Sequence, residues 1–178
     1  VARLTEAGLA EAGAGARVLF SAHGLPKKIV EKGDPYQWQV ERTCAAVAEK
    51  LGLDPEAWVV CYQSRVGPLE WIGPSTDAEI ARAGADGVPL VVVPVAFVSE
   101  HSETLVELDI EYRKLAVEKG VPSYHRVPTV DTDPVFVDGL ADLVAAALAR
   151  PVGIGSEDGA RICPAAWSGC PQAIAGGS

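Results

Sequence analysis

The chain has 178 residues, of which 48% are hydrophobic, so it can bury one substantial core and we expect one domain. Its 15 basic and 24 acidic residues give a net charge of −9, which argues against nucleic acid as a partner. No apolar run approaches the roughly 18 residues that span a bilayer, and no signal peptide is visible. The four cysteines are not spaced as a secreted disulfide framework, so we expect a reducing, cytoplasmic environment.

The beginning of the chain predicts the end of a helix and then a buried strand. Residues 1–15 are rich in alanine and glycine and carry a weak helical pattern, and the chain contains no methionine. We therefore expect residues 1–15 to be the end of a helix that belongs to something larger. Residues 18–22 form a short apolar run, typical of a buried strand, and a loop with glycine and proline follows directly.

A longer helix is predicted from Asp34, the expected N-cap. Pro35 would take the first helical position, Gln37 would complete a capping box, and Gly52 would end the helix. Four residues at helical spacing are expected to face the core: Val40, Cys44, Val47 and Leu51.

The remaining chain alternates strands with helices. Further strands are predicted at 58–63, 90–97 and, more weakly, 122–127. A short helix should run from Thr76 to near Gly84, and a last helix should begin at Asp133. Four residues of this last helix are expected to point inward: Val137, Leu140, Val144 and Ala147.

These four strand–helix units predict an α/β fold with an open, doubly wound, mostly parallel sheet. The domain should cover residues 16–150, and a tail rich in glycine, alanine and proline should cover residues 151–178. Neither G-x-G-x-x-G nor G-x-x-x-x-G-K-[ST] occurs, so the sequence offers no evident cradle for nucleotide phosphates.

An acidic helix is predicted from Ser102 onward. Its apolar residues recur at helical spacing and should face the core: Leu105, Leu108, Tyr112 and Leu115. Glu103, Glu107 and Glu111 follow one another at i+4 steps on a separate arc. Such a carboxylate ladder can conduct divalent cations or protons, and the plainer alternative is a solvated helix face.

Charged, histidine and aromatic side chains cluster where the first three strands end. Ligands of parallel α/β sheets bind beyond the carboxyl ends of the strands. Seven residues should share this rim: His23, Arg65, Trp71, Phe97, Glu100, His101 and Glu103. Together they would suit a flat apolar ligand that exchanges protons and meets a metal. Taken singly, each histidine could be an ordinary hydrogen-bonded loop residue, and Trp71 could serve packing alone.

Four ordered motifs carry a resemblance to a known family: S-A-H-G-L-P, D-P-Y, Q-S-R-V-G-P-L-E-W-I-G-P-x-T-D and F-V-S-E-H-S-E-T-L-V-E-L-D-I-E-Y. They resemble the ferrochelatases, which insert Fe²⁺ into protoporphyrin IX. The match runs from about residue 18 to residue 148. The resemblance implies a chelatase fold of two similar doubly wound halves with the porphyrin between them, and this chain resembles the second half only.

The resemblance also implies roles for individual residues. His23 would be the active-site histidine, as acceptor of pyrrole protons or as metal ligand, and Glu103 would be the carboxylate that faces it. The implied metal ligands are His23, Glu103, His101, Glu107 and Glu111, with the last two forming the acidic line.

Three further residues would bind substrate. Trp71 and Phe97 match aromatic residues near the macrocycle, whereas Arg65 would contact either a propionate or an internal acid. Glu100 departs mildly from the family pattern, in which aspartate also occurs.

The cysteines divide into two pairs. Cys44 and Cys61 are expected to be inert core residues. Cys163 and Cys170 lie in the tail, and some ferrochelatases hold a [2Fe–2S] cluster partly through C-terminal cysteines. A cluster needs four ligands, so this chain alone falls short, although the missing half could complete the set.

Three functions stay open at this point. The chain would be part of an enzyme that makes protoheme from protoporphyrin IX, inactive without its other half. A second possibility is that the enzyme acts on coproporphyrin III instead. A third is that the chain is a non-catalytic fragment that binds metal or heme. The implied partners are porphyrin, ferrous iron and the missing N-terminal half, and peripheral membrane contact stays open.

Overall fold

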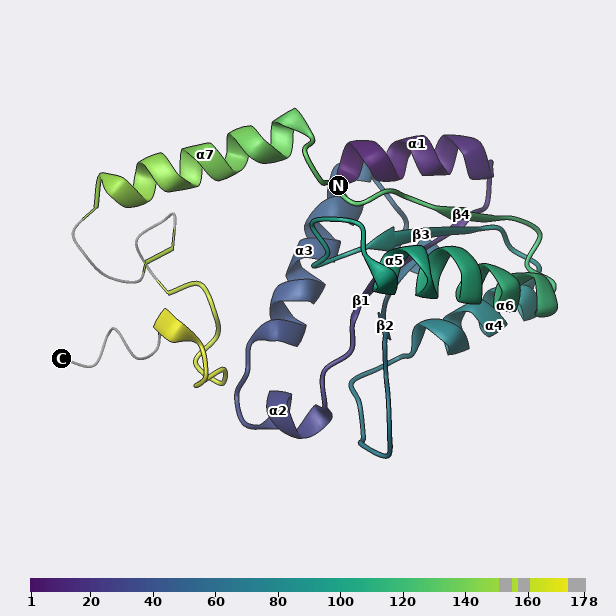
Figure 1. The fold of residues 1–178 in the computed structure, drawn as a ribbon, viewed down its shortest axis with the longest axis horizontal. Helices are drawn as coiled ribbons and strands as arrows, with labels where there is room; N and C mark the ends of the chain where they lie inside the picture. Colours follow the sequence, from purple (N-terminus) through teal and green to yellow (C-terminus); the bar gives the residue numbers. More distant parts are fainter. Residues whose placement is uncertain (151–154, 157–160, 173–178) are drawn as a thin grey trace.

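A computed structural model of the chain describes residues 1–150, 155–156 and 161–172 (Figure 1). Its centre is a four-stranded sheet made of β1 (Arg17–His23), β2 (Trp58–Gln63), β3 (Leu90–Pro94) and β4 (Tyr124–Arg126). The spatial order is β2-β1-β3-β4, and every pairing is parallel. The chain therefore winds outward in both directions from the boundary between β1 and β3, which confirms the predicted doubly wound α/β fold.

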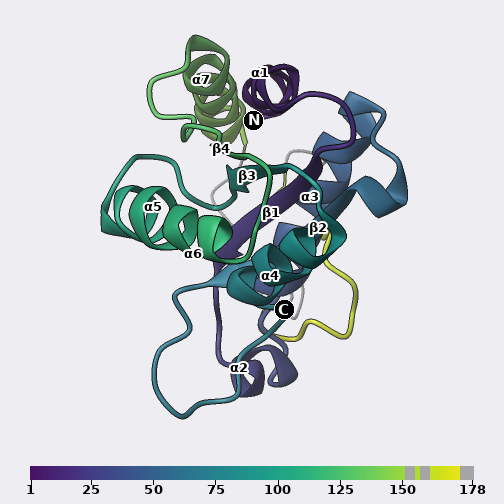
Figure 2. The same cartoon turned by 90° about the vertical axis from the view of Figure 1, so that its right-hand side faces the viewer.

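Helices cover both faces of this sheet (Figure 2). On one face, α1 (Ala2–Ala12) and α3 (Tyr36–Leu51) pack on alternate residues of β1, including Val18 and Phe20. On the other face, α4 (Thr76–Asp86) and α6 (Arg113–Glu118) enclose a second apolar cluster. Because side chains of a strand alternate between faces, the nearly continuous apolar runs of β1 and β3 follow from burial on both sides.

Two short segments complete the description of this region. Helix α2 (Lys27–Glu31) follows β1, and the 3₁₀ turn η1 (Pro55–Ala57) precedes β2. The third strand is shorter than predicted, because β3 ends at Pro94 instead of residue 97, whereas the acidic helix begins at Ser102 as predicted. Ala96 has a positive φ of 65°, which breaks the extended conformation.

The predicted capping box at the start of α3 is wrong. Asp34 does accept a hydrogen bond from the backbone N–H of Tyr36, at 2.9 Å. The helix begins at Tyr36, however, so Gln37 occupies the second helical position rather than the third. Its side-chain amide donates forward to Glu41 at 2.9 Å instead of reaching back.

The other helix ends agree more closely with the sequence pattern. Helix α4 begins as predicted at Thr76, with the Ser75 hydroxyl as its cap. It runs two residues past Gly84, to Asp86. Gly87 ends it at a φ of 67°, a left-handed conformation that glycine adopts without strain.

The acidic helix is not one regular helix. It consists of α5 (Ser102–Leu105), the π-helical segment η2 (Glu107–Tyr112) and α6. The backbone N–H of Glu111 donates to the Val106 carbonyl, five residues earlier. A π turn holds more residues than an α turn and rotates the following side chains. Leu108 is fully buried as predicted, whereas Leu105, which precedes the π-helical segment, is 47% exposed and contradicts its predicted core position.

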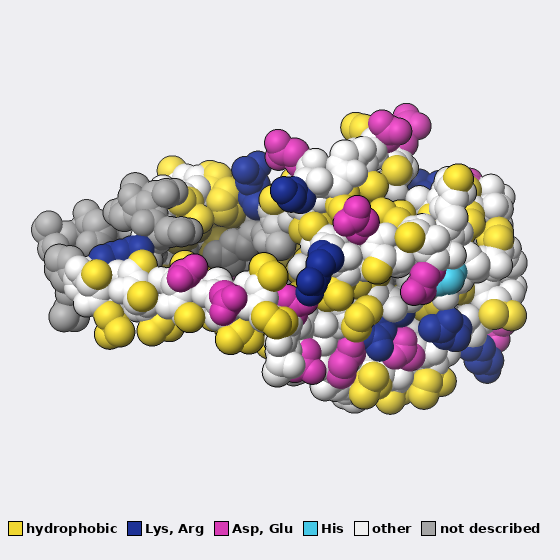
Figure 3. All heavy atoms as spheres, turned by 90° about the horizontal axis from the view of Figure 1, so that it is seen from above, with side chains coloured by type: hydrophobic (Ala, Val, Ile, Leu, Met, Phe, Trp, Pro, Cys, Tyr) yellow, Lys and Arg dark blue, Asp and Glu magenta, His cyan; other side chains and the backbone are white. Residues whose placement is uncertain are grey.

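The last helix, α7 (Pro134–Leu148), begins as predicted, with the Asp133 carboxylate accepting the Val135 N–H at 3.0 Å. It runs away from the sheet in Figure 1, and its hydrophobic side chains lie along the arm at the left of Figure 3. The prediction of an inward face is wrong within the described chain, because all four residues are exposed: Val137, Leu140, Val144 and Ala147. The apolar pattern specified a helix, but no described segment covers it. None of the described helices combines the length and the apolar character of a membrane span.

Candidate active site

The site lies where the carboxyl ends of β1 and β2 meet the amino end of α5. His23 is the last residue of β1, and Gln63 is the last residue of β2. The parallel register places these two residues directly beside each other. Glu103 enters from α5, the helix that follows the loop after β3. Parallel pairing thus brings together residues that lie 40 positions apart in the sequence.

His23 and Glu103 face each other across this rim. The Nε2 atom of His23 lies 3.4 Å from Oε1 of Glu103, and the two side chains are 42% and 39% exposed. The Nδ1 atom lies 2.6 Å from the carbonyl oxygen of Gly24. A carbonyl oxygen only accepts hydrogen bonds, so Nδ1 carries the hydrogen in the neutral ring. The lone pair of the imidazole therefore lies on Nε2, toward Glu103 and the solvent.

The main chain of His23 is also held in place. The hydroxyl of Tyr36, at the start of α3, donates to the His23 carbonyl oxygen at 3.0 Å. Burial is the main cause that raises the pKa of Tyr36 to about 12, so this phenol keeps its proton at neutral pH. Sequence reasoning did not identify Tyr36 as part of the site, although D-P-Y was among the motifs.

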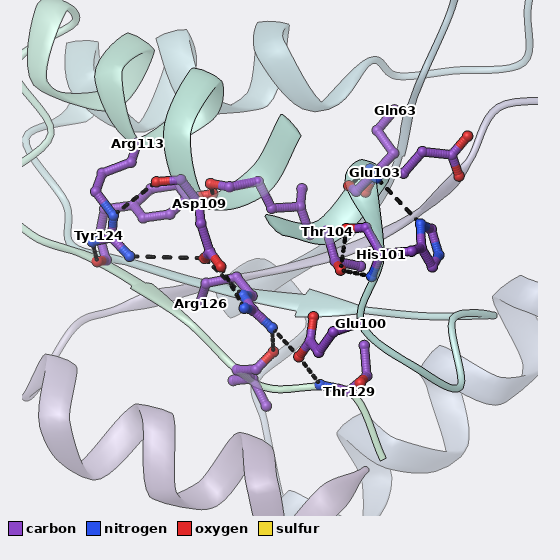
Figure 4. Close-up of polar contacts among 12 residues, drawn as sticks. Gln63, Glu100, His101, Glu103, Thr104, Asp109, Arg113, Tyr124, Arg126 and Thr129 are labelled. Atoms are coloured by element: carbon purple, nitrogen blue, oxygen red, sulfur yellow. Dashed lines mark hydrogen bonds and ion pairs between the residues drawn. The ribbon is translucent and has the colours of Figure 1, made fainter. Parts of the chain in front are cut away.

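Glu103 is positioned through its backbone (Figure 4). Its N–H donates to Nδ1 of His101 at 3.2 Å, and its carbonyl accepts from the side-chain amide of Gln63 at 2.7 Å. His101 is the N-cap of α5 and forms a reciprocal capping box with Thr104. The predicted metal ligand His101 thus uses one ring nitrogen to cap the helix, and its ring packs on Phe97 with centroids 5.2 Å apart.

The two other predicted ladder residues have very different surroundings. Glu107 accepts hydrogen bonds from four donors, namely Ser64 N at 2.7 Å, Ser64 Oγ at 2.5 Å, Gln63 Nε2 at 3.0 Å and Tyr112 Oη at 3.0 Å. Glu111 is exposed on η2. Among the described residues, no three or more His, Cys, Asp or Glu side chains form a group that could hold a metal ion. Within the predicted ligand set, the described contact between two side chains is the His23–Glu103 pair, whereas His101 contacts the backbone of Glu103.

The loop after β2 packs tightly against the turn that follows His23. A Cβ atom on Gly24 would lie 2.9 Å from the Gln63 carbonyl oxygen, 3.0 Å from Cγ of Arg65 and 3.2 Å from Cε3 of Trp71. A side chain at position 24 would therefore displace the predicted substrate-binding residues Arg65 and Trp71. The close approach explains why position 24 is a glycine. The sequence indicated only that this residue lies in a loop.

Two cavities lie near these residues. One of about 640 Å³ is lined by His23, Gly24, Leu25, Asp34, Pro35, Tyr36, Gln39, Ala96, Gly169 and Pro171. A second, apolar cavity of about 470 Å³ lies beside Phe97, between the start of the chain and the start of α7. Phe97 is buried and borders this second cavity, whereas His23 opens into the first.

Part of the tail forms one wall of the His23 cavity. The Gly169 N–H donates to the Gly33 carbonyl at 2.9 Å, and Trp167 packs on the core. The Sγ atoms of Cys163 and Cys170 lie 2.7 Å apart and are buried. Residues 151–154, 157–160 and 173–178 of the predicted tail lie outside the described residues.

The other two cysteines do not join this pair. Cys44 lies in the apolar cluster beneath α3, and Cys61 lies in the cluster on the opposite face of the sheet. Burial raises the pKa of each thiol to about 12, as expected of inert core cysteines. The described residues therefore bring together two of the four thiolates that a [2Fe–2S] cluster requires.

Glu100, predicted on the same rim, belongs to a separate ion network (Figure 4). Its carboxylate accepts from Arg126 Nη1 at 2.5 Å and from the Thr129 N–H at 3.0 Å. Arg126 also makes a bidentate contact with Asp109 through Nε and Nη2. Burial alone would raise the pKa of Glu100, but the hydrogen bonds from Thr129 and Arg126 lower it below its usual range. Glu100 is thus held as an anion at neutral pH.

Comparison with solved structures supports the fold class. The chain resembles a CbiX protein from Marinobacter aquaeolei VT8, named for cobalamin (vitamin B12) biosynthesis, with a TM-score of 0.52. Sequence identity is 21%, and the likeness covers 76% of this chain and 99% of the other. The chain is therefore a doubly wound α/β domain of this architecture.

Comparison with sequences is more specific. The family model described as ferrochelatase matches residues 1–148. The ferrochelatase of Caulobacter vibrioides NA1000 is 56% identical over 155 residues, which are 87% of this chain and 44% of that protein. The ferrochelatase of Wolbachia sp. subsp. Drosophila simulans is 58% identical over 127 residues, which are 71% of this chain and 39% of that protein. The chain belongs to the ferrochelatase family and spans about two fifths of the length of these curated relatives.

Proposed function

We propose that this chain is the C-terminal part of an enzyme that inserts Fe²⁺ into protoporphyrin IX, releasing two protons and forming protoheme. In this proposal, the upstream half of the protein supplies the opposite wall of the cleft. Family membership and the greater length of the relatives support both statements. The observation that carries the proposal is the accessible His23–Glu103 pair on the strand rim.

The proposed chemistry begins with His23. Two pyrrole N–H protons must leave before a porphyrin can bind a divalent metal at its four nitrogens. The Nε2 lone pair of His23 faces solvent and can accept such a proton, because Nδ1 is engaged by Gly24. Imidazole is a side chain that can both take and return protons in the physiological pH range, which suits the role of general base.

Glu103 would stabilise the protonated state of that base. Its carboxylate lies 3.4 Å from Nε2 and would attract the imidazolium that forms on proton transfer. A planar porphyrin presents its N–H groups poorly, so the complete cleft should favour a distorted macrocycle over a flat one. Fe²⁺ accepts imidazole and carboxylate ligands, and weak ligation would let the metal pass on to the porphyrin.

Roles for the remaining predicted residues follow from the same proposal. Trp71 and Phe97 would contact the macrocycle, and Arg65 would contact a propionate. His101 would offer the ring nitrogen that does not cap α5. Glu107 and Glu111 would carry metal or protons, with Glu111 the more accessible of the two carboxylates.

The decisive experiment compares two chains. The 178-residue chain and a chain extended upstream to full length are mixed anaerobically with Fe²⁺ and protoporphyrin IX, and heme formation is followed by absorbance. We expect no turnover by the short chain and turnover by the extended one. An inactive extended chain that still binds heme or metal would support the non-catalytic alternative. Preference for coproporphyrin III in the same assay would support that substrate instead.

A [2Fe–2S] cluster would require ligands beyond the tail pair. Cys163 and Cys170 would supply two thiolates, and the other ligands would come from the upstream half. Iron and acid-labile sulfide analysis of the extended protein tests this, and the absence of both would refute it. A cytoplasmic location is part of the proposal and is supported by the spacing of the four cysteines, which is not that of a secreted disulfide framework.

A further inference from the structure

Gln63 is a completely buried polar residue at the centre of the rim. It ends β2 beside His23, and its exposed fraction is 0%. Glutamine is mostly found at protein surfaces, so a buried one requires partners for its amide. No role in the chemistry falls to Gln63 itself, because its side chain does not contact the His23 imidazole in any described hydrogen bond.

The amide of Gln63 connects three elements. Its Oε1 accepts from the Ser21 hydroxyl of β1 at 2.8 Å. Its Nε2 donates to the backbone carbonyl of Glu103 in α5 at 2.7 Å, and to the Glu107 carboxylate in η2 at 3.0 Å. Both amide hydrogens are therefore used, and the bond from Ser21 fixes which end of the amide faces the two glutamates.

We propose that Gln63 is a positioning residue that sets Glu103 against His23 and couples this pair to Glu107. Helix α5 has only four residues before the helical path changes to the π-helical segment η2, so a hydrogen bond from β2 can add to the orientation that its N-cap provides. The Gln63 amide ties this short helix to the strand tip that is next to His23. The same amide fixes one oxygen of Glu107, and Ser64 and Tyr112 bind the remaining acceptor positions.

The positioning can be tested on the 178-residue chain without any catalytic assay. Gln63→Met keeps the length and the apolar stem but removes both donors and the acceptor. In the wild-type chain we expect an NOE cross-peak between the His23 imidazole and the Glu103 γ-methylene. We expect it to be lost or at least about twofold weaker in Gln63→Met, while the ¹H–¹⁵N spectrum stays dispersed.

Two further variants keep the result interpretable. Gln37→Met removes a comparable amide-to-carboxylate hydrogen bond on the surface of α3 and should leave the cross-peak unchanged. Ser21→Ala removes the hydroxyl that orients Gln63 and that also contacts the Thr76 hydroxyl at 2.9 Å, and it should weaken the cross-peak even if Gln63→Met fails to fold. Wild-type intensity in both Gln63→Met and Ser21→Ala, or in the folded one of the two, would overturn the positioning role.

The catalytic consequence rests on the proposed function and is measured separately in the extended protein. A displacement of about 1 Å can reduce a rate about 100-fold, so Gln63→Met should lower kcat by about 10- to 100-fold. The KM for porphyrin should change by less than about threefold, because binding surfaces stay intact. An unchanged kcat would overturn the catalytic consequence. An inactive wild-type extended protein would refute the proposed function, and the NMR comparison would still decide the role of Gln63.

Discussion

Glu100 and Glu103 lie three residues apart, yet their surroundings differ in a way that separates structure from chemistry. Glu100 faces Arg126, whose side chain is only 10% exposed, and a backbone N–H. Glu103 faces the imidazole of His23, in a pair that is about two fifths exposed. A guanidinium keeps its charge at all relevant pH values, whereas an imidazole gains and loses a proton near neutrality. The first pair can hold the fold, and the second can exchange protons.

Arg126 and His23 also differ in whether they contact a second carboxylate. Arg126 contacts Asp109 as well as Glu100, and the Asp109 hydrogen bonds are the first cause of its raised pKa. His23 has no second carboxylate among its described hydrogen-bond and ion-pair contacts. Removal of Arg126 would therefore leave Glu100 without a cation and Asp109 with only the 4.0 Å contact of Arg113, whereas removal of His23 would leave only the partly exposed Glu103 carboxylate. Four predictions test this difference.

His23→Ala should have the largest effect. In the extended protein we expect metallation to fall about 100- to 10,000-fold, the usual contribution of a positioned general base. The free energy of unfolding should change by less than about 0.5 kcal/mol, since the side chain is 42% exposed. His125→Ala is the matched control, because His125 lies on β4 and pairs with Glu11. A near-normal rate for His23→Ala would contradict its assignment as the base.

Arg126→Met should have the reverse profile. We expect the free energy of unfolding to fall by about 3 kcal/mol, because Glu100 and Asp109 lose their common cation. Urea denaturation of the 178-residue chain measures this change. Lys114→Met is the control, since its i,i+4 pair with Glu118 is exposed on both sides and should contribute less than about 1 kcal/mol. Equal effects of the two substitutions would remove the distinction.

Exchange of each glutamate for glutamine sharpens the comparison. Glu103→Gln removes the attraction between the carboxylate and the protonated imidazole of His23, which for an exposed pair is up to about 1 kcal/mol. Because this attraction would act in the proton-transfer step, its loss should lower kcat about fivefold. Its stability should hardly change. Glu100→Gln weakens hydrogen bonds from a charged donor and should lower the free energy of unfolding by about 1–2 kcal/mol. Steady-state kinetics of the extended protein and urea denaturation of both variants decide whether these profiles differ.

The smallest effect is a dependence on pH. The pKa of Glu100 is lower in the folded state than its ordinary value of 4.5, so the folded protein favours the charged carboxylate. This stabilisation is fully present above pH 4.5 and is lost as the pH falls through the lowered folded-state pKa. The stability difference between wild type and Glu100→Gln should therefore shrink on acidification. Urea curves from pH 7 to pH 3 measure it, and a difference that grows at low pH would contradict the sign.

Much of the fold was predictable because the signals are local. Strand and helix patterns depend on side-chain periodicity within a few residues, and parallel strands must end at one edge. That reasoning located β1, β2, α3 and α4 closely and put His23 and Glu103 on one rim. It also predicted the start of α7, since a cap acts within one turn.

Only the tertiary structure decided how the polar groups pair. Arg126 reaches Glu100 across 26 positions, and Gln63 reaches Glu103 across 40, and no local pattern encodes either partner. The π-helical segment η2 and the exposure of Leu105 were likewise absent from the regular helical pattern of the sequence. The sequence by itself determined which residues stand at the strand ends. Which carboxylate was neutralised and which stayed accessible depended on donors that folding brought from distant segments, because hydrogen bonds act only over a few ångströms.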